Sequence, residues 1–249
     1  MIVTCSYADI GIITALNSTL SQLKTDIKIE KRIDQANREF YIGVLDGQKI
    51  VIVRSPMGKV NNAITTQLLI SMFSIQKVIS VSPAGSTNDE IKIGDIVVAS
   101  RVYQHDFGTI KPYGFIWKEV PDGTGRNESG YNVLQSEMAG AAMDFAKKHF
   151  RDTRNTVHLE IIVSGDQFIS DPAKKGWLNK KFKAAAVDMG AGAIAQVCFA
   201  NQVPLCLIRV ITDKAGVSAR TEFNKSVEKY QSDLNIHHFL KGVIHGLKS

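Results

Sequence analysis

Short apolar runs alternate with longer amphipathic segments along this chain of 249 residues. The runs are rich in Val and Ile, as in Lys77–Ser82 and Pro204–Thr212, and have the length of buried strands. Segments such as Val60–Phe73 instead place apolar residues three and four positions apart, which is helical spacing. This alternation predicts an α/β fold in which helices flank a parallel or mixed sheet.

The same pattern predicts the other elements. We expect further strands over Ile10–Ala15, Arg38–Leu45, Lys49–Arg54, Asp95–Val102 and Glu160–Ser164. We expect further helices over Leu16–Lys24, Ser136–Phe150 and Ala191–Ala200, and a helical pair over Ser226–Leu247. Asp46-Gly47, between two of the strands, is a typical hairpin turn.

One segment breaks the alternation. Tyr103–Tyr131 carries Pro112, Pro121 and several glycines among scattered aromatics. It predicts a long loop, and such loops in compact domains are often functional lids. No linker, repeat or low-complexity tract divides the chain, so we expect residues 1–249 to form a single domain.

The charged residues do not alter the predicted fold or suggest a further function. The formal charge is +6, but the basic residues are spread among acids, with the densest groups at Lys28–Arg38 and Lys174–Lys183. Neither group comes with a zinc-binding pattern, and both are interpreted as solvated surface and not as a nucleic-acid site. The apolar runs are too short to span a bilayer, so we expect no membrane partner.

The cysteines indicate a reducing compartment. Cys5, Cys198 and Cys206 are odd in number and lack metal-ligand spacing, and the last two lie among apolar residues like core side chains. Met1–Asp9 has neither the basic start nor the apolar stretch of a secretory signal. We therefore expect a cytoplasmic protein without metal or cofactor.

Four stretches between Gly11 and Gly216, taken in order, are each weak signals but are specific together. They read GIITAL, then MGKVNNAITTQLLI, then PAGSTNDEIKIGDIVVASRVYQHD, and finally SGDQFISDP with VDMGAGAIAQVC and RVITDKAG. The set resembles the 5′-methylthioadenosine/S-adenosylhomocysteine nucleosidase family of the purine nucleoside phosphorylase superfamily. The resemblance implies a nucleoside phosphorylase-like fold, a twisted mixed sheet flanked by helices. It also implies a homodimer in which a partner's loop roofs the pocket.

The resemblance further implies cleavage of the glycosidic bond between a purine and its sugar. Asp213 matches the acid that donates a proton to purine N7, a role that needs a raised pKa. The alternative interpretation is that Asp213 is an ordinary aspartate at the N-cap of a helix. Phe168 matches the aromatic that stacks on the purine, and its alternative is an ordinary core side chain.

Other positions match the rest of the family's pocket. Met57 and Phe223 match residues on the 5′ side, and Met189 matches the residue packed beside the ribose. Tyr113 matches, within one residue, the loop aromatic that reaches across the dimer. Arg209 matches an arginine near the ribose, and as a lone arginine in an apolar strand it needs anionic or carbonyl partners. His105 and Asp106 also fall on a family motif and are interpreted as structural.

Three positions depart from the family. Thr19 replaces the glutamate that activates water, Pro83 replaces a serine near the ribose, and Gly190 replaces the glutamate that holds the ribose hydroxyls. Asp188, two residues before Gly190, is not an obvious substitute. The purine half of the pocket is therefore expected to be kept, and the half for sugar and water to be altered.

Three hypotheses follow. The first is a nucleosidase that hydrolyses an adenine nucleoside such as 5′-methylthioadenosine or S-adenosylhomocysteine, weakly or with an altered substrate. The second is a protein that binds a purine or nucleoside without turnover. The third is a phosphorylase, which the residues favour less because Gly11–Leu16 offers no arginine for phosphate.

Overall fold

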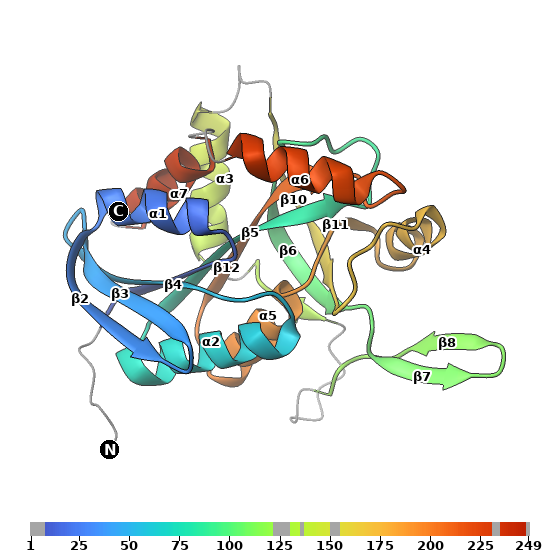
Figure 1. The fold of residues 1–249 in the computed structure, drawn as a ribbon, viewed down its shortest axis with the longest axis horizontal. Helices are drawn as coiled ribbons and strands as arrows, with labels where there is room; N and C mark the ends of the chain where they lie inside the picture. The colour runs from blue at the N-terminus through green and yellow to red at the C-terminus, as the bar shows by residue number, and fades with distance from the viewer. Residues whose placement is uncertain (1–7, 122–129, 135–136, 150–154, 231–234, 248–249) are drawn as a thin grey trace.

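A ten-stranded mixed sheet runs through the computed structural model, which describes residues 8–121, 130–134, 137–149, 155–230 and 235–247 (Figure 1). The strands, including a separate hairpin of β7 and β8, are β1 (Ile10–Thr14), β2 (Lys28–Gln35), β3 (Arg38–Leu45), β4 (Gln48–Arg54), β5 (Lys77–Ser86), β6 (Ile96–Gln104), β7 (Gly108–Lys111), β8 (Gly114–Trp117), β9 (Tyr131–Asn132), β10 (Val157–Ser164), β11 (Ala184–Asp188) and β12 (Leu205–Asp213). The helices are α1 (Asn17–Asp26), α2 (Lys59–Phe73), α3 (Glu137–His149), α4 (Pro172–Phe182), α5 (Ala191–Ala200), α6 (Ala219–Tyr230) and α7 (Asn235–Gly246).

The strand order is β11-β10-β6-β12-β5-β1-β4-β3-β2, with β9 paired to β6. Parallel pairs join β1 to β4 and β5, β12 to β5, and β10 to β6 and β11, whereas β12 and β6 are antiparallel. β11 also pairs with β5, so β11, β10, β6, β12 and β5 close on themselves. The predicted α/β fold with a mixed sheet is confirmed.

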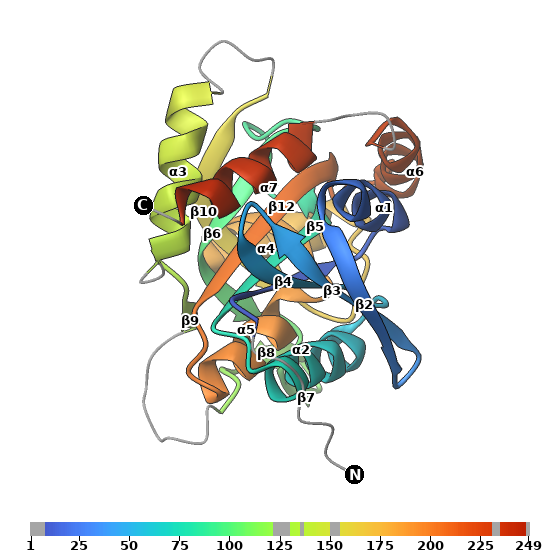
Figure 2. The same ribbon diagram turned by 90° about the vertical axis from the view of Figure 1, so that its left-hand side faces the viewer.

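Helices cover both faces of the sheet, as Figures 1 and 2 show. On one face α2 and α5 pack with Leu69, Phe73 and Ile194 in the core. On the other, α1, α3 and α7 bury side chains such as Leu23 and Phe239. None of the helices in the described part of the chain is long and apolar enough to cross a membrane.

Local sequence signals explain several elements. Asp46 and Gly47 have φ of 50° and 83°, the left-handed values of the predicted hairpin turn between β3 and β4. β12 is buried at every position, as a run of apolar residues predicts for a central strand. Asp171 begins α4 by accepting hydrogen bonds from the backbone N–H groups of Ala173 and Lys174.

The prediction of a long loop over Tyr103–Tyr131 is wrong in part. β6 continues to Gln104, and β7 and β8 form a hairpin that projects from the sheet (Figure 1). The Trp117 indole donates to the Gln104 carbonyl over 2.7 Å and packs on Phe182, which fixes the hairpin base. The prolines and glycines masked this pairing, and residues 122–129 of the predicted loop lie outside the described residues.

The two basic segments lie at the surface, as expected. Both contain secondary structure that the sequence did not predict, because their many charged residues hide the apolar pattern. Lys28–Arg38 holds edge strand β2, and Lys174–Lys183 falls almost wholly on α4. β11 was also missed because its small residues, AAAVD, resemble a helix as much as a strand. The predicted C-terminal pair corresponds to α6 and α7, but α6 begins earlier, at Ala219. Ser136 and Phe150, at the ends of the predicted third helix, are not among the described residues.

The cysteines that the structure describes behave as core residues. Cys198 and Cys206 are buried, free thiols, as expected from their apolar neighbours. Burial raises the pKa of Cys206 to about 12, so it stays a thiol at neutral pH. Cys5 lies outside the described residues.

Candidate functional site

A pocket of about 230 Å³ opens where several strands end. Strands β1, β4, β5, β11 and β12 bring their carboxyl ends or the residues after them to it, which is where ligands bind in α/β sheets. Its walls also include the start of α2, the segment after β10, and α6. The lining residues are Ala15, Leu16, Arg54, Pro56, Met57, Asn62, Ser82, Pro83, Ala84, Gly85, Gln167, Phe168, Ile169, Val187, Asp188, Met189, Gly190, Thr212, Asp213, Arg220 and Phe223.

Asp213 ends β12 inside this pocket and is 3% exposed. Burial raises the pKa of its carboxyl, although hydrogen bonds from the Ala215 N–H (2.9 Å) and the Thr212 hydroxyl (3.0 Å) oppose that rise. A Cβ at Gly85 would lie 2.6 Å from Asp213 Oδ1, so a glycine makes room for the carboxyl there. The arrangement favours a carboxyl that keeps its proton to a higher pH than usual.

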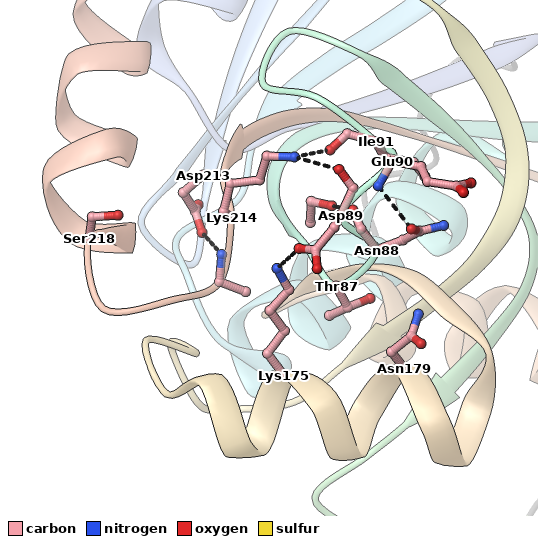
Figure 3. A network of polar contacts seen from close by, with 12 residues as sticks. Thr87, Asn88, Asp89, Glu90, Ile91, Lys175, Asn179, Asp213, Lys214 and Ser218 are labelled. Carbon is pink, nitrogen blue, oxygen red and sulfur yellow. Dashed lines mark hydrogen bonds and ion pairs between the residues drawn. The ribbon is translucent and has the colours of Figure 1, made fainter.

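Polar contacts hold the chain just after Asp213 in place (Figure 3). Lys214 extends its Nζ to the carbonyls of Ile91 (2.5 Å) and Asp89 (3.3 Å), and the Asp89 carboxylate pairs with Lys175. The Lys214 N–H donates to Glu222 Oε2 over 2.8 Å. These contacts fix the backbone on which Asp213 sits.

Two aromatic rings line the same pocket as Asp213. Phe168 follows β10, and its ring meets Phe223 of α6 edge to face, with centroids 5.9 Å apart. The Arg220 guanidinium lies over Phe168, 4.0 Å from the ring centroid. An aromatic surface in the same pocket as a carboxyl with a raised pKa suits a heteroaromatic base.

Arg209 lies beneath the pocket and does not line it. It is fully buried, and its guanidinium donates to Asp188 Oδ2 (2.6 Å) and to the carbonyls of Ser80 (3.1 Å) and Ile208 (2.8 Å). These are the anionic and carbonyl partners that an arginine in an apolar strand requires. Arg209 therefore reaches the pocket only through Asp188.

Asp188 does line the pocket, but its carboxylate is occupied. Oδ1 accepts from the N–H groups of Gly190 (3.2 Å) and Ala191 (3.1 Å), and Oδ2 accepts from Ala191 and Arg209. It anchors the start of α5 as well as the buried arginine. The expectation that Asp188 is not an obvious substitute for the missing glutamate stays a prediction, and these contacts are consistent with it.

The structure brings seven of the ten predicted positions to one pocket. They are Met57, Pro83, Phe168, Met189, Gly190, Asp213 and Phe223. Arg209 lies below it, and Thr19 is buried on α1 without lining it. Tyr113 sits in the β7–β8 turn, 79% exposed and outside the pocket of its own chain.

Sequence reasoning missed several lining residues. Asn62 belongs to the quoted stretch MGKVNN, where nothing local separates it from Asn61. Arg220 lies one helical turn before Phe223, a spacing that would have indicated the same face of α6. Arg54 has only its place at the end of a strand as a signal.

His105 and Asp106 join elements around the pocket without lining it. Asp106 accepts from Lys59 Nζ (2.7 Å) and from the Asp166 N–H (2.8 Å), while Asp166 accepts from the Lys59 N–H (2.7 Å). His105 is fully buried, and neither ring nitrogen has a hydrogen-bond partner in the described residues. Burial lowers the pKa of His105 to about 4. This geometry supports the structural interpretation of the pair.

Known proteins share this fold and sequence. Residues 9–241 match the family model of the phosphorylase superfamily. The 5′-methylthioadenosine/S-adenosylhomocysteine nucleosidase of Anoxybacillus flavithermus is 33% identical over 222 residues, 89% of this chain and 92% of that protein. The enzyme of the same name from Marinomonas is 31% identical over 94% of this chain and 98% of that protein.

Solved structures agree. The nucleosidase of this type from Colwellia psychrerythraea, in complex with adenine, is similar with a TM-score of 0.84 and 28% identity, over 97% of this chain and 96% of that one. Futalosine hydrolase of Helicobacter pylori is similar with a TM-score of 0.81 and 27% identity, over 97% of this chain and 98% of that one. The chain belongs to the phosphorylase superfamily and, within it, to the family of 5′-methylthioadenosine/S-adenosylhomocysteine nucleosidases.

Proposed function

We propose that this protein hydrolyses the N-glycosidic bond of an adenine nucleoside such as 5′-methylthioadenosine or S-adenosylhomocysteine. One observation carries the proposal: a buried carboxyl with a raised pKa, Asp213, and the Phe168 ring line one pocket at the strand ends. Relatives over nearly the whole chain are nucleosidases of this kind.

The purine half of the reaction follows from these groups. The base stacks on Phe168 while protonated Asp213 donates its proton to N7. The bond between C1′ and N9 then breaks, its electron pair passes into the purine, and positive charge develops on the sugar. Water adds to C1′ and releases a proton to solvent, and solvent returns a proton to Asp213, which leaves free adenine and a free sugar. Met57 and Phe223 contact the 5′ side, and Met189 packs beside the sugar.

The sugar half of the pocket is poorer in functional groups. Gly190 and Pro83 offer no polar side chain, and the Asp188 carboxylate already accepts from three donor groups. Asp188 and Asp213 are the only carboxylates among the described residues that line the pocket. Each missing group costs on the order of tenfold to a thousandfold in rate, so turnover is expected to be slow.

The small number of functional groups in the sugar half of the pocket favours a second candidate function. This function is the binding of adenine or an adenine nucleoside without turnover. Both functions use Asp213 and Phe168, and they differ only in whether base is released. A phosphorylase would in addition require phosphate for base release.

The test incubates purified protein with 5′-methylthioadenosine, S-adenosylhomocysteine, adenosine and 5′-deoxyadenosine, with and without phosphate, and measures free adenine by chromatography. We expect adenine from at least one nucleoside without phosphate. Asp213→Asn is expected to lower the rate by roughly tenfold to a thousandfold. Asp144→Asn, at an exposed acid on α3, is the matched control and should keep the rate.

The outcomes separate the candidates. No adenine from any nucleoside, together with a rise in melting temperature on adding adenine that Asp213→Asn removes, would support the binding protein instead. Neither adenine release nor a thermal shift would exclude both.

The same proposal includes a cytoplasmic homodimer in which the β7–β8 hairpin of one protomer approaches the pocket of its partner. The exposed Ile110 and Tyr113 at this hairpin support it, since large apolar side chains at the surface often mark contacts. Tyr113 would then contribute to the partner's pocket.

A further inference from the structure

Gly190 and Asn62 compete for the same space in the pocket wall. A Cβ built on Gly190 would lie 2.7 Å from Asn62 Nδ2 and 2.8 Å from its Cγ, closer than real Cβ contacts allow. Gly190 follows β11, whereas Asn62 comes from α2. Asn62 as placed therefore excludes any side chain at position 190.

The backbone itself does not demand glycine there. Gly190 has φ −152° and ψ −29°, outside the left-handed region that favours glycine. The contact with Asn62 is thus the feature of the described structure that forbids a larger residue. A larger side chain at position 190 therefore requires a smaller or displaced side chain at position 62.

The Asn62 amide is fixed in orientation. Its Nδ2 donates to the Gly58 carbonyl over 2.9 Å and to the Pro56 carbonyl over 3.3 Å, which uses both amide hydrogens. Its Oδ1 receives no hydrogen bond from the described residues, although Asn62 is 9% exposed and lines the pocket. An oriented acceptor in a pocket wall is suited to a donor from a ligand.

We propose that Asn62 Oδ1 is the group that accepts a hydrogen bond from a sugar hydroxyl of the bound nucleoside, from the place beside Gly190 that the Asn62 amide occupies. The inference rests on the proposed function, because Asp213 and Phe168 hold the base and so direct the sugar toward Asn62. A neutral amide replaces a carboxylate at this place, so hydroxyl recognition is retained but weaker.

The experiment measures binding, so it does not depend on turnover. Dissociation constants of adenine, adenosine, 2′-deoxyadenosine and 3′-deoxyadenosine are measured by calorimetry for the wild-type protein and for Asn62→Ala. The wild type should bind adenosine roughly threefold to tenfold more tightly than at least one deoxynucleoside. Asn62→Ala should abolish that preference and leave the adenine constant unchanged. Asn201→Ala, an exposed asparagine at the end of α5, should leave both unchanged.

Position 190 supplies a second, independent readout. Gly190→Glu alone should weaken adenosine binding and lower the melting temperature, because its Cβ meets Asn62. Combining it with Asn62→Ala should restore binding and raise the preference for adenosine above that of the wild type, since a carboxylate is the stronger acceptor. The effects of the two substitutions should therefore be strongly non-additive.

An unchanged preference in a folded Asn62→Ala protein would overturn the inference and leave the proposed function intact. Additive effects of Gly190→Glu and Asn62→Ala would do the same. If the wild type binds neither adenine nor adenosine, the proposed function fails and the inference fails with it.

Discussion

Two carboxylates lie in the same pocket in opposite environments. Asp188 accepts hydrogen bonds from two backbone N–H groups and from the buried guanidinium of Arg209. Asp213 is buried with fewer donors, and its pKa is raised. Contrasting environments of this kind assign contrasting tasks, an anchoring anion and a proton donor.

At the scale of single residues, we predict how Asp213→Asn changes the melting temperature. Because the native pKa of Asp213 lies above its unfolded value, the folded state binds more protons between the two values. The free energy of unfolding therefore falls as pH rises through that window and stays lowered at neutral pH. Asparagine does not ionise, its Oδ1 can still accept from the Ala215 N–H, and its amide can donate to the Thr212 hydroxyl oxygen in place of the bond that this hydroxyl donates to Asp213. The variant should thus melt at or above the wild-type temperature at pH 7, in thermal scans across pH, while it loses activity. A variant less stable than wild type at pH 7 would contradict this account.

His105 makes stability depend on pH in the opposite direction from Asp213. Burial lowers its pKa from 6.5 to about 4, so the unfolded chain binds more protons between these values. Stability should fall as pH drops from about 6.5 to about 4, by on the order of 3 kcal/mol. His105→Leu should flatten the curve of melting temperature against pH in this range. Equal slopes for both proteins would show that the imidazole does not govern acid stability. The charges of Asp106, Lys174, Lys59 and Asp188 around it are retained in the variant.

At the scale of elements, one carboxylate joins three parts of the pocket wall. Asp106 follows β6, and it holds Lys59 at the start of α2 and the Asp166 N–H after β10. Burial opposes its charge, but the hydrogen bonds from Lys59 and Asp166 keep the pKa of Asp106 below its usual value. The positions of Met57 and Phe168, which flank these contacts in sequence, depend on this junction.

We therefore predict that Asp106→Ala lowers the free energy of unfolding by about 2 kcal/mol in chemical denaturation, the usual cost of removing hydrogen bonds to a charged group. Adenine binding should weaken with it. Asp144→Ala removes an exposed carboxylate, 3.5 Å from Lys147, and should cost under about 0.5 kcal/mol. Equal effects of the two substitutions would argue against a junction at Asp106.

At the scale of the whole molecule, the closed part of the sheet brings β5, β11 and β12 to one place, so that Gly85, Asp188 and Asp213 meet. The β7–β8 hairpin instead projects outward with Ile110 and Tyr113 exposed by 84% and 79%. Ile110 and Tyr113, unlike Trp117, would be buried only against another molecule.

We predict a dimer of twice 27.4 kDa by light scattering after gel filtration. Replacing Ile110 and Tyr113 by aspartate should shift it to the monomer, because charge would then be buried in the interface. Ile29→Asp on edge strand β2 is the control and should leave the mass unchanged. A monomeric wild type, or a shift with the control alone, would count against a contact through the hairpin.

The sequence by itself determined the alternation of strands and helices and the hairpin at Asp46-Gly47, because local periodicity and turn chemistry specify them. It also determined the matches at Asp213 and Phe168, because these residues lie in short motifs. It did not reveal β2, α4, β11 or the β7–β8 hairpin, where charge, small residues or prolines mask the local pattern. Only the tertiary structure decided that Arg209 lies beneath the pocket on Asp188, that Thr19 does not line it, and that Asn62 fills the space beside Gly190. These facts depend on contacts between residues distant in sequence, which strand pairing and helix packing set and no local pattern encodes.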